Sequence, residues 1–450
     1  MNSVELRASA SLASIFGLRM LGMFVILPVF AIYAEQLEGG SNLTLVGIAL
    51  GAYGLTQAFL QVPFGWMSDR YGRKPVIYFG LAIFALGSFI AAMADSIYWV
   101  IFGRIVQGAG AISAAVMAMT ADLTREEHRT KAMAMIGSTI GLTFALSLVA
   151  SPWLNHLIGV PGIFALTGVL ALGAMIVVYA LVPDVPGGLL PRPSTPMRFT
   201  AVLADPELAR LNFGIFVLHA VLMALFIVVP LAMRDAGLAV DQHWKVYLPV
   251  MLGSFVLMLP AIFAGERRGR ARAAFLGAVA LLLVGQLTMP WLLSSITQIT
   301  VFLLVFFTAF NVLEASLPSL VSRFAPPQAK GAAIGLYSSV QFFGTFVGAA
   351  CGGFLYQRFG AQGIFVFDVV LLAAWLAFAW NMQPRARAAT RVFALPALDE
   401  VHTDSLVERL RAEPGVRGVQ LAAGGRTAYL EIDTSGFDEQ RVLRLIAGEV

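Results

Sequence analysis

Three ionisable side chains stand inside long apolar stretches of the sequence, where a charge is costly and usually has a function. Glu314 lies nine residues before Arg323, so about 13 Å inside the boundary that this arginine marks. His219 and Arg19 each lie eight residues into an apolar stretch, at a similar depth. We interpret Glu314 as a proton-coupling residue with His219 or an arginine as its partner. A fixed structural ion pair, or an acid that stays neutral, explains the same residues equally well.

Uncharged polar side chains also lie within the apolar stretches and could line a cavity. Each of them alone is more often a hydrogen bond between two helices. The five candidates are Tyr53, Gln57, Asn311, Tyr337 and Gln341. Asp368, only five residues into the last stretch, is expected at the membrane interface instead.

The composition sets the class of protein that holds these residues. Of 450 residues, 12% are charged, against about 25% in soluble domains, and 58% are hydrophobic. The mean hydropathy is +0.80. These values exclude a water-soluble enzyme and predict an all-α polytopic protein of the lipid bilayer. One cysteine, Cys351, excludes an intrachain disulfide and a Cys-based metal site. We expect no metal, no cofactor, no enzymatic activity and no nucleic-acid partner.

Apolar stretches of about 20 residues, long enough to cross a bilayer, occur twelve times. They are approximately 11–34, 43–67, 75–94, 97–120, 132–157, 162–182, 211–233, 244–264, 273–293, 297–320, 332–356 and 363–382. A Pro- and Gly-rich stretch separates the first six from the last six. The predicted organisation is an N-terminal six-helix bundle (1–182), a linker (183–210), a C-terminal six-helix bundle (211–384), a short linker (385–392) and a soluble domain (393–450).

The two halves are related in sequence. Residues 162–164 and 363–365 both read Gly-Ile-Phe and begin the sixth and twelfth stretches, at an offset of 201. Phe24 and Phe226 correspond at an offset of 202. Two parallel repeats place a substrate cavity at their interface, near the middle of the membrane.

The distribution of lysine and arginine predicts the orientation. Fifteen of them lie in loops on one side, against three on the other, Arg234, Lys245 and Arg358. The basic side is therefore expected in the cytoplasm together with both termini, and the protein in the inner membrane of a bacterium.

The chain after residue 392 is soluble-like and predicts a small α+β domain. Strands are expected at 392–395, 416–422 and 427–432, and helices at 403–412 and 437–447. This order predicts a ferredoxin-like half-sandwich. It is similar to heavy-metal-associated domains, but the metal-binding cysteine pair of those domains is missing. The free edge of the sheet predicts weak self-association.

The most specific motif is the loop segment Gly-Trp-Met-Ser-Asp-Arg-Tyr-Gly-Arg-Lys at 65–74. Its glycines permit a close helix contact and a tight turn. Its acid has a use at a helix end only beside a cation or a helix N-terminus. Its bases anchor the loop at a membrane surface or take part with the acid in a conformational latch. The residues concerned are Gly65, Asp69, Arg70, Gly72, Arg73 and Lys74.

Residues 65–74 match the loop signature G-x-x-x-D-R-x-G-R-K and resemble the major facilitator superfamily. The segments 18–24, 53–58, 129–134 and 243–248 resemble a family of bacterial inner-membrane transporters within it. The likeness covers nearly all of the chain. It implies the twelve-helix major facilitator fold with a ferredoxin-like domain after the last helix, and a proton-driven exporter related to drug/proton antiporters.

The resemblance also implies roles for particular residues. Asp69 would pair with the start of the eleventh helix, near 330–333, and Arg73 with Asp122 at the end of the fourth. Arg104, in Arg-x-x-Gln-Gly, resembles a superfamily motif that is linked to proton transfer. An arginine that snorkels to the outer interface is the alternative for Arg104.

We therefore expect a secondary active transporter that uses protons to export a small amphipathic or apolar compound by alternating access. A facilitative or import carrier is one alternative, because the antiporter motif of the fifth helix is poorly kept around Pro152. A sensor that binds a ligand and signals through its cytoplasmic tail is the other.

Overall fold

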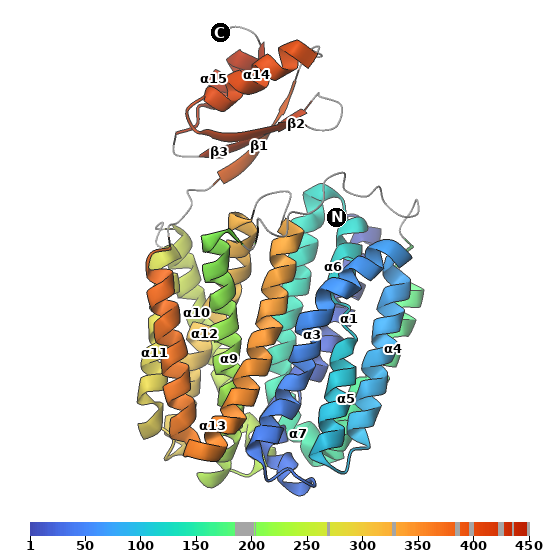
Figure 1. Cartoon of the computed structure of the whole chain (residues 1–450), viewed down its shortest axis with the longest axis vertical. Helices are drawn as coiled ribbons and strands as arrows, with labels where there is room; N and C mark the ends of the chain where they lie inside the picture. The colour runs from blue at the N-terminus through green and yellow to red at the C-terminus, as the bar shows by residue number, and fades with distance from the viewer. Residues whose placement is uncertain are drawn as a thin grey trace. The chain divides into compact units, whose positions relative to one another are not determined.

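The computed structural model describes residues 1–184, 202, 204–267, 271–325, 330–382, 388–395, 400–421, 427–433 and 436–447 (Figure 1). The chain divides into two compact units. The helical unit comprises Met1–Ser322 and Pro327–Asn381, and the C-terminal unit comprises Arg323–Pro326 and Met382–Val450.

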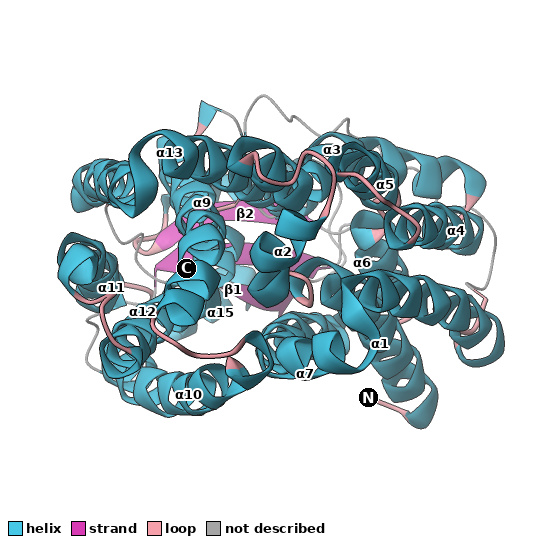
Figure 2. Cartoon of the chain, turned by 90° about the horizontal axis from the view of Figure 1, so that it is seen from below, coloured by secondary structure: helices cyan, strands magenta, loops and turns pink. Residues whose placement is uncertain are grey.

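The first half of the helical unit contains α1 (Ser3–Phe24), α2 (Leu27–Tyr33), η1 (Ala34–Gln36), α3 (Leu43–Tyr71), α4 (Arg73–Ala92), α5 (Ile97–Ala109), α6 (Ser113–Asp122) and α7 (Glu126–Leu181). The second half contains α9 (Pro206–Asp235), η2 (Val240–Gln242), α10 (Trp244–Arg267), α11 (Ala271–Thr288), η3 (Met289–Trp291), α12 (Ile296–Phe324) and α13 (Lys330–Trp380). Seen along the helix axes, α3–α6 group on one side and α9–α12 on the other (Figure 2).

Ten segments of the described chain are long and apolar enough to span a membrane. Two of them, in α7 and α13, have 51 and 50 residues. At 1.5 Å per residue each would be about 75 Å long, more than twice the ~30 Å hydrocarbon thickness. Each turns at a glycine in the left-handed region, Gly159 (φ 67°) and Gly360 (φ 63°). Each is therefore two spans, which gives the twelve that the sequence predicts.

The first helix begins eight residues before the predicted start. Asn2 and Glu5 form a capping box, in which each side chain accepts a hydrogen bond from the other's backbone N–H at 2.8 Å. These two bonds supply acceptors for backbone N–H groups that have none within the helix at its N-terminus. The Asn-x-x-Glu spacing was visible in the sequence, but the apolar stretch starts later.

Glycines of α3 bring the two halves into close contact along one part of the helix. A Cβ at Gly47 would lie 2.1 Å from the carbonyl oxygen of Ala349 in α13, and one at Gly51 would lie 2.9 Å from Phe346 Cα. Near the other end of α3, Gly65 instead faces Ala114 of its own half. The α3–α13 contact is thus tight at one end of the bundle. We call this the far end, and the opposite end, where α3 passes into α4, the basic end.

The C-terminal unit contains β1 (Ala388–Ala394), α14 (Glu400–Ala412), β2 (Val416–Leu421), β3 (Thr427–Asp433) and α15 (Glu439–Ala447). Its three strands form an antiparallel sheet in the order β1-β3-β2. Alternate residues of β3, Ala428, Leu430 and Ile432, point into a core shared with Leu410 of α14 and Leu445 of α15. β1 begins inside the predicted 385–392 linker, and α14 begins three residues before the predicted helix.

Candidate functional site

In the second half, three helices bring Glu314, His219 and Gln341 together, and we call these residues the acid cluster. Gln341 Nε2 lies 2.8 Å from His219 Nε2 and donates to Glu314 Oε1 at 3.4 Å. His219 Nε2 lies 3.9 Å from Glu314 Oε2, an oxygen that has no hydrogen-bond partner among the described residues. The His219 side chain is 4% exposed and that of Glu314 27%. The predicted pairing of Glu314 with His219 therefore has a geometric basis, with Gln341 between them.

Tyr337 and Asn311 lie near the acid cluster but differ in what they contact. Tyr337 is one turn before Gln341 in α13, is buried, and lies close enough to Glu314 to interact electrostatically. Asn311, one turn from Glu314, points to α10 instead and donates to Ser254 Oγ at 3.0 Å. Asn311 therefore joins two helices, as intramembrane polar residues more often do.

In the first half, Arg19 of α1 and Arg104 of α5 converge on Tyr53 of α3, and we call these residues the basic cluster. The guanidinium carbons lie 5.9 Å and 4.9 Å from the centre of the tyrosine ring, in cation–π contact. All three side chains are buried. No Asp or Glu of the described chain forms an ion pair with either arginine. Arg104 is thus buried inside the bundle and does not snorkel to an interface.

The two arginines differ in their hydrogen bonds. Arg104 donates to Gln107 Oε1 at 2.6 Å and to the carbonyl oxygens of Gly22 (3.3 Å) and Leu50 (3.5 Å). Arg19 donates to Ser113 Oγ and lies close to the Tyr53 hydroxyl, while its Nε and Nη2 have no acceptor in hydrogen-bond geometry among the described residues. Gln57 lies in the same half and donates to the Gly108 carbonyl at 2.6 Å.

Phe342 of α13 reaches from the second half to the basic cluster. Its ring lies 6.0 Å from the Arg19 guanidinium and 6.4 Å from the Tyr53 ring. The preceding residue, Gln341, belongs to the acid cluster. One turn of α13 therefore contacts both clusters, which places them at the boundary between the halves.

Aromatic rings lie between the clusters and the far end. Phe144 of α7 is in ring contact with Phe24 of α1 (4.9 Å) and with Phe226, Phe307 and Phe310 of the second half (5.8–6.5 Å). Along their helices these residues lie beyond Arg19, His219 and Glu314 in the direction of the far end. They form a layer that joins the halves on that side of the clusters.

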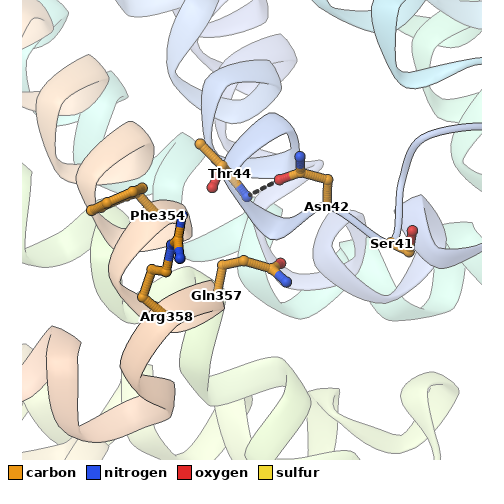
Figure 3. A pocket seen from close by; sticks show the side chains of 6 residues that line it. All are labelled: Ser41, Asn42, Thr44, Phe354, Gln357 and Arg358. Atoms are coloured by element: carbon orange, nitrogen blue, oxygen red, sulfur yellow. Dashed lines mark hydrogen bonds between the residues drawn. The ribbon is translucent and has the colours of Figure 1, made fainter.

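The far end is also held by polar contacts between the halves. Arg234 Nη1, at the end of α9, donates to both carboxylate oxygens of Glu35 in η1 at 2.8 Å. The Leu43 N–H, at the start of α3, donates to Gln357 Oε1 of α13 at 2.8 Å. Gln357 also lines a shallow pocket at this end, together with Ser41, Asn42, Thr44, Phe354 and Arg358 (Figure 3). None of the pocket residues belongs to either cluster.

At the basic end, the contacts of the loop signature among the described residues lie within the first half and with Asp184, directly after it. Arg73 Nε donates to Asp122 Oδ2 at 2.9 Å, and Arg73 Nη1 donates to Ser68 and to Asp69. Arg70 lies over the rings of Trp66 and Tyr71, and Lys74 pairs with Asp184 at 2.8 Å. Gly72 makes the turn with φ 96°.

Among the described residues, Asp69 has no contact with the first turns of α13 in this conformation. Its side chain is 63% exposed, and Arg73 is its one partner among the described residues. An added Cβ at Gly331 or Gly335, in the first turns of α13, would meet nothing within 4 Å. No described residue of the first half therefore packs against these two glycines, and the expected Asp69 contact is not seen among the described residues, while Arg73 and Asp122 do meet.

Sequence reasoning missed three features. Glu35 and Arg234 end the first and seventh spans, so the repeat places them at matching ends, which was a usable signal. Phe144 in an apolar helix could not be told from an ordinary core residue. Asp368 was expected at the interface but is fully buried, and neither of its carboxylate oxygens has a partner among the described residues. Its helix starts after Gly360, so it lies eight residues and about 12 Å in.

The profile of the Major Facilitator Superfamily matches residues 12–265 and 211–398 of the chain. The chain is 42% identical over 445 residues, 98% of each chain, to the inner membrane transport protein YajR of Escherichia coli (strain K12). It is 25% identical to the multidrug resistance protein MdtH of Aeromonas salmonicida (strain A449), over 76% of this chain and 86% of the relative. The crystal structure of a bacterial homologue of the human lysosomal transporter Spinster, inward-facing and occupied, superposes with a TM-score of 0.69 at 15% identity, covering 85% of this chain and 97% of that one.

Proposed function

Because the chain belongs to the major facilitator superfamily, we propose that it is a proton-coupled exporter of small amphipathic or apolar compounds that works by alternating access. A relative named as a multidrug resistance protein supports the export of such compounds. A repeat-built transporter holds its substrate between its halves near the middle of the membrane. The acid and basic clusters occupy that boundary.

The observation that carries the proposal is the environment of Glu314. One carboxylate oxygen faces Gln341, while the other has no hydrogen-bond partner among the described residues and lies 3.9 Å from His219 Nε2. An acid that is held this loosely in an apolar helix is costly to charge, so it takes up a proton readily and releases it when its neighbours rearrange to stabilise the charge. Its side chain remains partly exposed while His219 is enclosed. Glu314 is thus the group that takes up and releases the transported proton.

The contacts at the two ends define the conformation in this proposal. The far end is held by Glu35–Arg234 and by the packing of α3 on α13, whereas at the basic end no described residue of the first half packs against Gly331 and Gly335 of α13. With the basic end in the cytoplasm, as the positive-inside rule predicts, this is the inward-facing state. In the outward-facing state the far-end contacts break, and Asp69 meets the start of α13. A periplasm-only reporter fused after Ser295 is then active, and one fused after Arg391 is silent.

The C-terminal unit supports a second candidate function, that of a ligand sensor. Its β1-α14-β2-β3-α15 order corresponds to a ferredoxin-like half-sandwich with its own core and, within the described chain, two unpaired sheet edges. Such a unit favours a ligand sensor that signals through the tail, and weak self-association through an edge. A sensor body would show substrate counterflow but no net flux under any gradient.

The test uses the full chain in proteoliposomes with an imposed pH gradient and three probes. They are ethidium, a cation, 1-naphthamide, which is neutral, and 1-naphthoate, an anion. The proposal expects at least one probe to be moved against its own gradient, with protons flowing in the opposite direction. Probe equilibration without proton movement would indicate a facilitative carrier and would overturn proton coupling.

A further inference from the structure

Arg19 is a buried cation whose surroundings leave part of it unused. Its side chain is 2% exposed, and its polar neighbours in the described chain are two hydroxyls, that of Ser113, to which it donates, and that of Tyr53, neither of which carries a counter-charge. Nε and Nη2 have no acceptor among the residues described. Burying a charged group without an ionic partner costs more free energy than cation–π contacts return. The protein therefore maintains a charge here that nothing in its own described chain neutralises.

Arg104 shows that this is particular to Arg19. The two arginines share Tyr53 as a neighbour, yet Arg104 has a side-chain acceptor and two carbonyl acceptors in place. Its hydrogen bonds are those of an arginine that fixes helices together. Arg19 presents the opposite case, with free donors that can form new bonds without breaking old ones.

The position of Arg19 connects these donors to the transported compound. Phe342 of the opposite half lies against its guanidinium, so Arg19 stands at the boundary that opens and closes during alternating access. The rings of Tyr53 and Phe342 offer an apolar surface beside the charge. A guanidinium is a planar fork that matches two oxygens of one acid group.

We infer that Arg19 binds the acidic group of an organic anion, so that the transported compound is an amphipathic acid. The inference rests on the proposed function, because it takes the boundary between the halves as the substrate cavity. The acid group supplies the counter-charge that the described protein lacks, and the apolar body of the compound contacts Tyr53 and Phe342. Because Arg19 is buried in the state described here, binding requires that the Phe342 ring moves away from its guanidinium.

Binding to the purified full chain in detergent tests this without any transport. 1-Naphthoate and 1-naphthamide differ in one group, and the shift in melting temperature is measured against the concentration of each. We expect saturable stabilisation by naphthoate, none by the amide, and none by chloride at equal ionic strength. Arg19→Gln should weaken naphthoate binding about tenfold or more, since a hydrogen bond to a charged group contributes about 1.5–3 kcal/mol. Arg19→Lys keeps the charge but loses the planar pair of donors. Its affinity for naphthoate should lie between that of the wild type and that of Arg19→Gln.

Arg358→Gln is the matched control, because it removes an exposed arginine at the far end and should leave binding unchanged. The melting temperature without ligand is a second readout. The Arg19→Gln variant should melt at a temperature no lower than the wild type, whereas replacing an arginine with a purely structural role would lower the melting temperature.

Three results would each overturn the inference: failure of naphthoate to bind, equal binding of the amide or of chloride, and unchanged affinity for naphthoate in Arg19→Gln. If ethidium or naphthamide is transported with proton coupling but naphthoate is not, the inference of an anionic substrate fails and the proposed function stands. If naphthoate binds but is not transported, the anion site stands and the proposed function fails.

Discussion

The basic and acid clusters lie on the two sides of one boundary, yet they are built from different chemistry. The basic cluster contains two arginines, whose guanidinium groups are charged at neutral pH. The acid cluster contains a carboxyl group and an imidazole, both of which can change charge. The first half of the repeated fold therefore holds groups that are charged at neutral pH, and the second half holds groups whose charge can change.

The repeat itself makes this difference instructive. At the offset of 202 that relates Phe24 to Phe226, Arg19 corresponds to Val221 and His219 corresponds to Gly17. A Cβ at Gly17 would lie 2.5 Å from Thr139 Cγ2, so the first half has no room for a histidine there. The two halves share their helices but not the positions of their polar groups. In the proposed function, the shared fold would position the substrate cavity, and the unshared residues would determine what binds on each side of it.

The largest effect is expected on the acid cluster, from Glu314→Gln. The amide mimics the protonated acid, so probe accumulation driven by a pH gradient should fall to the level of empty vesicles. Exchange of probe across the membrane should continue without proton movement. Proton and probe fluxes are measured in the same vesicles, with Glu38→Gln as the control because that acid is exposed at the far end. If coupling survives in Glu314→Gln, Arg104 and the loop acids become the candidates.

The next effect separates the two arginines of the basic cluster by stability. Arg104→Gln leaves Gln107 and two buried carbonyls without their donor, at a cost of about 1–3 kcal/mol. Arg19→Gln leaves only Ser113 without one and removes an unpaired charge. Thermal unfolding without ligand should therefore show a lower melting temperature for the Arg104 variant alone. Equal losses in both variants would show that the two sites are equivalent.

Sequence reasoning reached the spans, the ionisable residues and the pairs Glu314–His219 and Arg73–Asp122, but not the other contacts of these residues. The length of an apolar stretch and the cost of a charge within it are local properties. The twelve spans, and the selection of Glu314 and Arg104 as candidate functional residues, could therefore be predicted from the sequence. Which side chains meet depends on helix rotation and on the conformational state. Asn311 therefore turned toward Ser254, and Phe342 was not identified as a link. Asp69 shows the second limit, because its expected contact belongs to a state in which the halves meet at the basic end.

A smaller effect is expected at the far end, where Glu35 and Arg234 join the halves. Their side chains are 47% and 37% exposed, so the pair contributes up to about 1 kcal/mol, a few-fold change in the balance of states. Glu35→Gln should open the far end more often. Spin labels at Gln36 and Ala239, in a chain with Cys351 replaced by serine, measure that separation. High salt should act as the mutation does. The exchange of Glu35→Arg with Arg234→Glu should restore the wild-type distance, and no change in any variant would exclude the pair as a gate.

The smallest effect is expected at the basic end, from Asp69→Asn. In the state described here Asp69 is exposed and paired with Arg73 alone among the described residues, so the mutation costs this state little. In the opposite state the acid would lie at the N-terminus of α13, where a negative charge contributes roughly 0.3–1 kcal/mol. The Asp69→Asn variant should therefore shift the population toward the conformation that is open at the basic end.

Cysteines introduced at Tyr71 and Gly331, one in each half, report that shift as slower cross-linking. Asp95→Asn, an exposed acid at the far end, should cross-link at the wild-type rate. Asp122→Asn should differ from Asp69→Asn, because Asp122 already pairs with Arg73 in the state described here. Its loss weakens the loop within its own half in both states and changes the balance between them less. If Asp69→Asn cross-links as fast as the wild type, the acid has no partner in α13 and the far-end contacts alone determine the state.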